Sequence, residues 1–141
     1  MEELFVTSEA AKALGIERQQ LANLSTRGHI EADVRGARGV CGKACAPNQF
    51  QRETIYETAV LLRLMDWGLI HNNIRLYMRA LRRAKGDTSL SSYHFATFKL
   101  GDVPECTLSP HPQECATYLP EHTLIINCRD LCRRIDRRLD A

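Results

Sequence analysis

The segment from residue 4 to residue 30 constrains the fold of this chain more than any other part of it. Its sequence is LFVTSEAAKALGIERQQLANLSTRGHI, and its apolar residues fall at spacings that place them on facing helical stripes. Gly15 interrupts the pattern, and a glycine at such a position lets a helix end and the chain reverse. We therefore predict two short helices, one ending at Leu14 and one over residues 18–26. Two helices joined by a Gly-containing turn form the helix-turn-helix, which places its second helix in the DNA major groove.

Capping signals mark the ends of both predicted helices. We expect Thr7 to be the N-cap of the first helix, with Glu9 in the first turn, where a carboxylate favours the positive end of the helix dipole. Glu17 or its neighbour would cap the second helix, and Gly28 would end it.

The middle of the chain continues with a loop and two more helices. Residues 31–50 are rich in Gly and Ala and carry scattered basic side chains, a composition that suits a β-hairpin wing. Helical periodicity returns over residues 52–67 and 70–84, with Gly68 between them. The run GDTSLSS then breaks the pattern.

The remainder changes to short strands and one helix. Residues 93–100, 115–119 and 122–127 read as strands around Pro-containing turns, and residues 127–139 form an amphipathic helix. The predicted fold class is therefore mainly α with small β content (α+β). We expect a winged helix-turn-helix with a helix pair, then short antiparallel strands and a C-terminal amphipathic helix. The domains would be residues 1–85, which bind DNA, and 86–141, which serve dimerisation, effector sensing or both.

The C-terminal helix is too short to be stable alone in water, so its apolar face must pack on something. A partner subunit and the strands of the same chain are the two alternatives, and the sequence does not choose between them. The apolar face consists of Cys128, Leu131, Cys132, Ile135 and Leu139. The residues predicted to serve dimerisation are Leu131, Ile135 and Leu139.

Composition limits the class of protein. The chain has 141 residues, of which 26% are charged and 44% hydrophobic. This composition is typical neither of disordered proteins nor of membrane proteins. No apolar run approaches the roughly 18 residues that a membrane span needs. The start, MEELFV, is acidic, which argues against a secretory signal and favours the cytoplasm. The net charge of +2 does not by itself indicate a nucleic-acid partner.

Two segments resemble the DNA-binding domain of the MerR family of bacterial transcription regulators. EAAKALGIERQQLANLSTRGHI aligns without a gap on the opening helix pair of that family, and NQFQRETIYETAVLLRLMDWGLIHNNIRLYM is similar to its following helix pair. Phe50 takes the aromatic position after the wing, and Gly68 the glycine between the helices. The resemblance implies a winged helix-turn-helix that binds double-stranded DNA. The family has an Arg and two Tyr where this chain has Ala22, Asn23 and Leu24, so we expect its docking on DNA to differ in detail.

The second predicted helix groups its polar side chains on one face. Glutamine and asparagine can pair with adenine, and arginine with guanine, in the major groove. Thr7 with the start of the first helix, and Arg27 at the end of the second, would hold phosphates. Basic side chains of the wing would follow a groove or its phosphates. The candidate DNA-binding residues are Thr7, Arg18, Gln19, Gln20, Asn23, Arg27, Arg35, Arg38 and Lys43.

The six cysteines fall at spacings that match no CxxC motif of a zinc knuckle or redox site. Cys41 and Cys45 lie in the predicted wing, where they would bind a soft metal or oxidise, or else serve no special role. Cys128 and Cys132 lie one helical turn apart, a spacing that suits two ligands or two small buried side chains. We expect no cofactor, with metal or thiol sensing as the alternative.

The function predicted from the sequence is that of a sequence-specific DNA-binding transcriptional regulator acting as a homodimer. No catalytic motif is recognisable, so we do not expect an enzyme. One alternative is a phage excisionase-like architectural protein that bends DNA. Another is a protein-interaction adaptor on a helix-turn-helix scaffold without DNA affinity.

Overall fold

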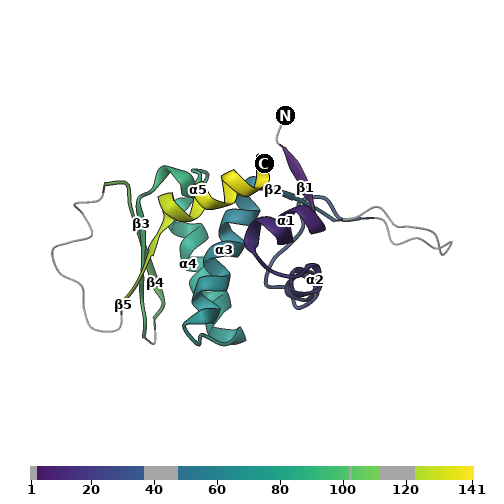
Figure 1. Ribbon diagram of the computed structural model, residues 1–141. Helices are drawn as coiled ribbons and strands as arrows, with labels where there is room; N and C mark the ends of the chain where they lie inside the picture. Colours follow the sequence, from purple (N-terminus) through teal and green to yellow (C-terminus); the bar gives the residue numbers. More distant parts are fainter. Residues whose placement is uncertain (1–2, 37–47, 102, 112–122) are drawn as a thin grey trace. The chain divides into compact units, whose positions relative to one another are not determined.

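A computed structural model describes residues 3–36, 48–101, 103–111 and 123–141 (Figure 1). The described residues combine helices with small antiparallel sheets, which confirms the predicted α+β class. The elements in order are β1 (Leu4–Val6), α1 (Thr7–Leu14), α2 (Arg18–Thr26), β2 (Gln49–Gln51), α3 (Arg52–Asp66), α4 (His71–Lys85), the 3₁₀ turn η1 (Leu90–Ser92), β3 (Phe95–Lys99), β4 (Glu105–Ser109), β5 (Thr123–Asn127) and α5 (Cys128–Leu139). None of the helices described is long and apolar enough to cross a bilayer.

The chain divides into two compact units. The first comprises residues 1–58 together with residues 135–141, and the second comprises residues 59–134. This division differs from the single cut between residues 85 and 86 that the sequence suggested: the break falls within α3, after residue 58, and the end of α5 belongs to the first unit.

The first unit contains the predicted pair of short helices. Gly15 follows α1 with φ 71°, and Ile16 N donates to the carbonyl oxygen of Ala11 at 3.0 Å. The same arrangement ends α2, where Gly28 has φ 76° and His29 N donates to the carbonyl oxygen of Leu24 at 3.0 Å. Both ends are Schellman motifs, which need a residue in the left-handed region. The predicted helix ends are therefore confirmed.

Thr7 is not the N-cap of α1, so that prediction was wrong. Val6 is the last extended residue, with φ −72° and ψ 164°, and Thr7 is already helical. The reason is that β1 leads directly into α1, which moves the extended residue one position earlier. Glu9 completes the cap, since its Oε1 accepts from Val6 N at 3.3 Å.

A two-stranded sheet and the helix pair make up the core of the first unit. β1 pairs antiparallel with β2, with Phe5 opposite Phe50, and both rings are buried. The helices pack through small and branched apolar side chains that are each at most 5% exposed: Ala10, Ala11, Ala13, Leu21 and Leu24. Alanines in α1 let the helices approach closely, which is how this pair forms a compact unit.

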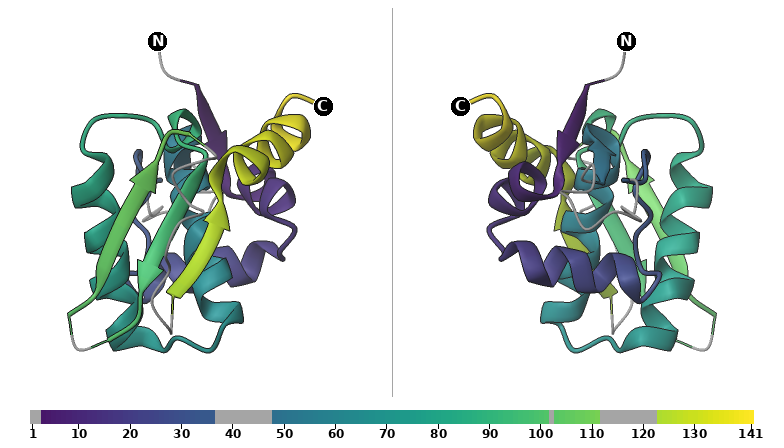
Figure 2. Two further views of the ribbon diagram at one scale, coloured as in Figure 1. Left: turned by 90° about the vertical axis from the view of Figure 1, so that its left-hand side faces the viewer. Right: turned by 90° about the vertical axis from the view of Figure 1, so that its right-hand side faces the viewer.

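The second unit is a three-stranded antiparallel sheet packed against α4. The strand order is β4-β3-β5, and the strands lie side by side in Figure 2. Phe98 of β3 lies opposite Cys106 of β4 and Leu124 of β5, so these three side chains share one face. Phe98 is fully buried, and its ring meets that of Tyr77 from α4 edge to face at 6.2 Å. The strands described thus pair within one chain.

The sequence predicted β3 and β5 but not β4. β4 lies between Pro104 and Pro110, and these prolines made the segment read as turns. Proline is nevertheless compatible with the end of an edge strand, where the missing N–H costs no ladder bond. The strand predicted over residues 115–119 lies outside the described residues.

The beginning of α5 is held by the sheet of its own chain. Cys128 N donates to the carbonyl oxygen of His94 at 2.9 Å, directly before β3. The side chains of Cys128 and Cys132 are buried, with 0% and 2% exposure. Of the two alternatives for the apolar face of this helix, the structure supports packing within the chain for these two residues.

Candidate nucleic-acid interface

The exposed face of α2 is the strongest candidate for a functional site. Leu21 and Leu24 point inward, as the sequence predicted, with 1% and 5% exposure. Five polar side chains of the helix and its end are all exposed: Arg18, Gln19, Gln20, Asn23 and Arg27. The nine-residue helix thus exposes one cation and three amides, and Arg27 adds a second cation directly after it. Such side chains can donate to and accept from base edges and phosphates.

Hydrogen bonds already order the amide side chains of this face. Gln19 Nε2 donates to Asn23 Oδ1 at 3.0 Å, one helical turn further on. Gln20 Oε1 accepts from Glu17 N at 2.8 Å and so caps the start of α2, where Glu17 is the N-cap as the sequence predicted. The side-chain oxygen of Gln20 is therefore used to cap the helix, whereas the side chains of Gln19 and Asn23 are hydrogen-bonded to each other.

The end of α5 stabilises the helix pair from within the first unit. Arg138 Nη1 donates to the carbonyl oxygen of Ala13 at 2.9 Å. Ala13 lies in the last turn of α1, where carbonyl groups lack helical partners and favour a cation. A Cβ added to Gly15 would lie 3.2 Å from the same Nη1, so the Arg138 side chain would have to shift by a few tenths of an ångström. Sequence reasoning missed the contact because the two residues are 125 positions apart.

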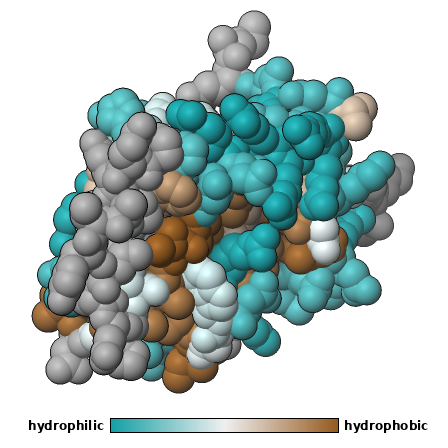
Figure 3. Space-filling model, turned by 60° about the vertical axis from the view of Figure 1, so that its left-hand side comes forward, coloured by the Kyte–Doolittle hydropathy of each residue, from teal (hydrophilic) through white to brown (hydrophobic). Residues whose placement is uncertain are grey.

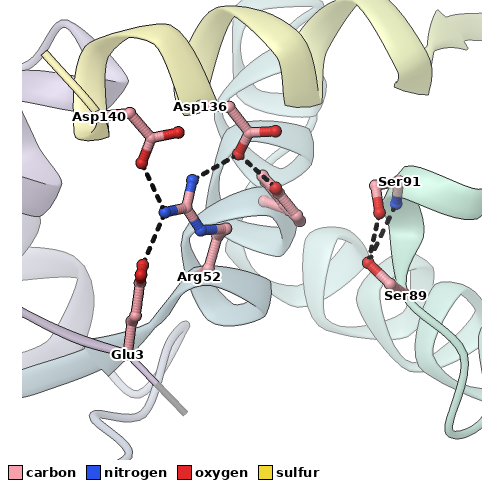
Figure 4. A network of polar contacts seen from close by, with 7 residues as sticks. Glu3, Arg52, Ser89, Ser91, Asp136 and Asp140 are labelled. Atoms are coloured by element: carbon pink, nitrogen blue, oxygen red, sulfur yellow. Dashed lines mark hydrogen bonds and ion pairs between the residues drawn. The ribbon is translucent and has the colours of Figure 1, made fainter.

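Arg52 at the start of α3 joins the termini of the first unit (Figure 4). Its Nη2 lies 2.7 Å from Glu3 Oε2 and 2.8 Å from Asp140 Oδ1, and its Nη1 lies 2.7 Å from Asp136 Oδ1. The Tyr56 hydroxyl also donates to Asp136. The hydrogen bond to Asp140 and the other carboxylates raise the pKa of Arg52 above its ordinary value. We refer to Glu3, Arg52, Asp136 and Asp140 as the Arg52 cluster.

The Arg52 guanidinium also lies 5.3 Å from the centre of the Phe5 ring. Since Phe5 belongs to β1, this cation–π contact adds a further tie between α3 and the small sheet. The cluster therefore joins β1, the start of α3 and the end of α5 within the first unit.

The predicted wing is described only at its base. Val34 and Gln49 exchange both backbone hydrogen bonds, at 3.1 and 2.8 Å, and Gly36 N donates to Asn48 Oδ1 at 2.8 Å. This antiparallel pairing brings the two ends of the intervening segment together, as a hairpin requires. Arg35 at this base is exposed and lies 3.4 Å from Glu31. The remaining wing candidates lie outside the described residues: Arg38, Cys41, Lys43 and Cys45.

The other predicted site residues differ in how far their side chains are exposed to solvent. Thr7 is only 9% exposed, so its hydroxyl offers little surface to a phosphate. Of the residues predicted to serve dimerisation, Ile135 is 4% exposed and is used inside the chain. Leu131 and Leu139 are half-buried and keep some exposed surface.

Exposed apolar side chains occur in the second unit. Figure 3 shows apolar areas that interrupt the hydrophilic surface on the face it presents. Among the described residues of this unit, the large apolar ones that are more than a third exposed are Trp67, Ile70, Leu76, Val103 and Ile125. Ile70 and Val103 are 68% and 71% exposed, which is a large amount of apolar surface for single side chains.

Of the cysteines described in the second unit, Cys128 and Cys132 are buried in its core and Cys106 is half-buried. No group of three or more metal-ligating side chains occurs within the part of the chain that the structure describes. Burial raises the pKa of both Cys106 and Cys128 to about 12. The thiol form therefore predominates at neutral pH, and a buried thiol behaves as a small apolar side chain.

This burial predicts slow thiol chemistry. In the folded protein at pH 8, we expect Cys106 and Cys128 to react with iodoacetamide about 100-fold more slowly than in urea, because the thiolate is the reactive form. Peptide mass spectrometry after timed alkylation measures the rate for each cysteine. Equal rates in the folded and urea-unfolded protein would contradict the burial of these thiols.

No family model matches this chain, and no curated protein matches it with statistical significance. The resemblance to MerR regulators therefore stays a prediction from the sequence. The geometry of α1, α2 and the residues around them is therefore the basis for a functional proposal.

Proposed function

We propose that this chain is a cytoplasmic, sequence-specific DNA-binding protein of the MerR-like winged helix-turn-helix type that regulates transcription. The observation that carries the proposal is the polar face of α2. Leu21 and Leu24 fix this helix on α1, while Arg18, Gln19 and Asn23 project from its exposed side. A short helix held in this way on a second helix is the element that enters the major groove in helix-turn-helix proteins.

The surroundings of α2 support a groove-binding role. Arg27 extends the exposed basic surface beyond the end of the helix, and Arg35 lies at the base of the paired segment that begins at Val34. Cations at these places are suited to phosphates on either side of a groove, since phosphate contacts fix the register of a reading helix. Arg38 and Lys43 would belong to the same wing.

We further propose that the protein acts as a homodimer on a two-fold symmetric site. One helix of nine residues reads few base pairs, so a single copy would discriminate poorly between sites. Two copies related by a two-fold axis read two half-sites, which squares the discrimination. Exposed apolar side chains of the second unit, such as Ile70, offer surface for self-association.

The test is a binding titration of the purified, reduced protein against a pool of random duplexes at two salt concentrations, with sequencing of the retained DNA. Enrichment of a palindromic motif is the expected result. Salt-sensitive binding without enrichment would instead favour an architectural protein. Absence of binding at low salt would favour the adaptor and remove the proposal.

A substitution within α2 tests which element reads the site. On the selected duplex, we expect Arg18→Ala to lower the affinity about tenfold, as the loss of one base or phosphate contact does. Arg133→Ala, which removes the same charge from an exposed position on α5, serves as the matched control and should change the affinity less than twofold. Equal losses for the two variants would contradict the assignment of α2.

A further inference from the structure

Two amide side chains on α2, those of Gln19 and Asn23, are hydrogen-bonded to each other and are therefore ordered together rather than independently. Gln19 and Asn23 are joined by one hydrogen bond of 3.0 Å and are both exposed. The described residues supply no further side-chain partner to either amide. The bond favours one geometry of both side chains on the outer face of the helix. Part of the entropy of ordering them is therefore lost already in the free protein rather than on binding.

The hydrogen-bonding groups left over on the pair are defined by this bond. Gln19 Nε2 donates and Asn23 Oδ1 accepts, so Gln19 Oε1 stays available as an acceptor and Asn23 Nδ2 as a donor. Reversing both amides keeps the bond and merely exchanges which residue supplies the acceptor and which the donor. In either orientation the pair presents an acceptor and a donor side by side.

This outward pattern matches one purine. In the major groove, adenine offers the N6 amino donor next to the N7 acceptor, whereas guanine offers the two acceptors O6 and N7. A guanine would set O6 against the free acceptor of the pair, so it could be bound only through the remaining N–H groups of the two amides. The pair therefore matches adenine through both its acceptor and its donor, whereas guanine leaves the acceptor unused.

We propose that Gln19 and Asn23 act as a single unit that reads one adenine in each half-site. In the orientation found in the structure, Gln19 Oε1 accepts from adenine N6 and Asn23 Nδ2 donates to adenine N7. This inference rests on the proposed function, since it needs α2 in a major groove. It assigns the specificity of one position to two residues acting together.

Gln20 differs from this pair although it is the same residue type as its neighbour Gln19. Its Oε1 already accepts from Glu17 N at the start of the helix. An amide whose oxygen is engaged there offers a base or a phosphate chiefly its Nε2 donors, and these cannot accept from the adenine N6 group. Gln20 therefore provides a matched control within the same helix.

The experiment uses the full-length protein and the duplex selected from the random pool. Each adenine of a half-site is replaced in turn by 7-deazaadenine, which lacks N7, or by purine, which lacks the N6 amino group. For one adenine per half-site, we expect each replacement to weaken binding of the unaltered protein about tenfold. Gln19→Ala, Asn23→Ala and the double variant should weaken binding to a similar extent and show no response to either analogue. Gln20→Ala should keep the response.

The outcomes separate this inference from the proposed function. Specific binding without a response to any adenine analogue overturns the inference and leaves the proposed function standing. The same is true if Gln19→Ala still responds to 7-deazaadenine, or if the losses of the two single variants add in the double variant. Failure to bind any duplex overturns both. The analogues change only the DNA, so the adenine test does not depend on how well the variants fold.

Discussion

Replacing Arg52 with alanine is expected to lower the free energy of unfolding by about 2 kcal/mol. The Arg52 side chain is 25% exposed and is shared by three carboxylates, whose side chains are 38–68% exposed. Breaking a fully buried ion pair costs about 3–5 kcal/mol and breaking an exposed one about 0–1 kcal/mol, so this half-buried cluster falls between the two. Urea denaturation followed by circular dichroism measures the loss.

The loss has two physical components. Alanine removes the hydrogen bonds from the guanidinium, and it leaves Glu3, Asp136 and Asp140 close together without a cation. Repulsion among exposed carboxylates is screened by salt. We therefore expect part of the loss to be recovered at 0.5 M NaCl, whereas the part due to lost hydrogen bonds and packing against Phe5 should remain.

The matched control is Arg35→Ala. Arg35 also pairs with a carboxylate, Glu31 at 3.4 Å, but the two side chains are 79% and 80% exposed. Removing such a pair should change the free energy of unfolding by less than about 0.5 kcal/mol. If the two variants lost equal stability, the Arg52 cluster would not be the tie between β1, α3 and α5 that its geometry indicates.

The elements that the sequence predicted best are those whose determining residues lie close together in the sequence. α1 and α2 depend on apolar spacing within about ten residues and on Gly15 and Gly28, which favour the left-handed conformation that ends each helix. α5 was likewise recognisable from the spacing of its apolar residues. Because these signals act within a few residues of one another, they can be read without knowledge of the fold.

Elements and contacts that depend on residues far apart in the sequence were not predictable. β1 has only three residues, too few for a period of two to be recognised, and it forms only because Phe5 pairs with Phe50. The contacts of Arg52 with Asp136 and of Arg138 with Ala13 span 84 and 125 positions. Nothing in the sequence marks these partners, since most charged residues remain solvated on the surface.

The candidate site was predictable in outline but not in its internal bonds. Helical spacing separated the buried Leu21 from the exposed Gln19 and Asn23. The bond between those two amides has the separation of four positions at which helical side chains meet, and Gln20 stands three positions after Glu17, the spacing of a capping box. Both signals were present in the sequence and would have distinguished Gln20 from Gln19.

The largest loss of stability is expected from Phe98→Ala. Phe98 is fully buried in the central strand of the sheet, between Cys106 and Leu124 on the same face and against the Tyr77 ring. Truncating such a phenylalanine removes its apolar burial and leaves a cavity, which together cost about 3–5 kcal/mol. For a chain of this size the melting temperature should fall by about 10 °C, as measured by differential scanning calorimetry.

Phe95→Ala is the control that tests the register of the sheet. Phe95 lies on the same strand but three positions earlier, so the pleat turns its side chain to the opposite face, where it is half-buried. Its ring lies against that of His94, tilted by 58° with 4.5 Å between the ring centres, and its truncation should cost only about 1 kcal/mol. A slip of β3 by one residue would exchange the two faces and therefore reverse the order of the two losses. A larger loss for Phe95→Ala than for Phe98→Ala would thus contradict the pairing of Phe98 with Cys106 and Leu124.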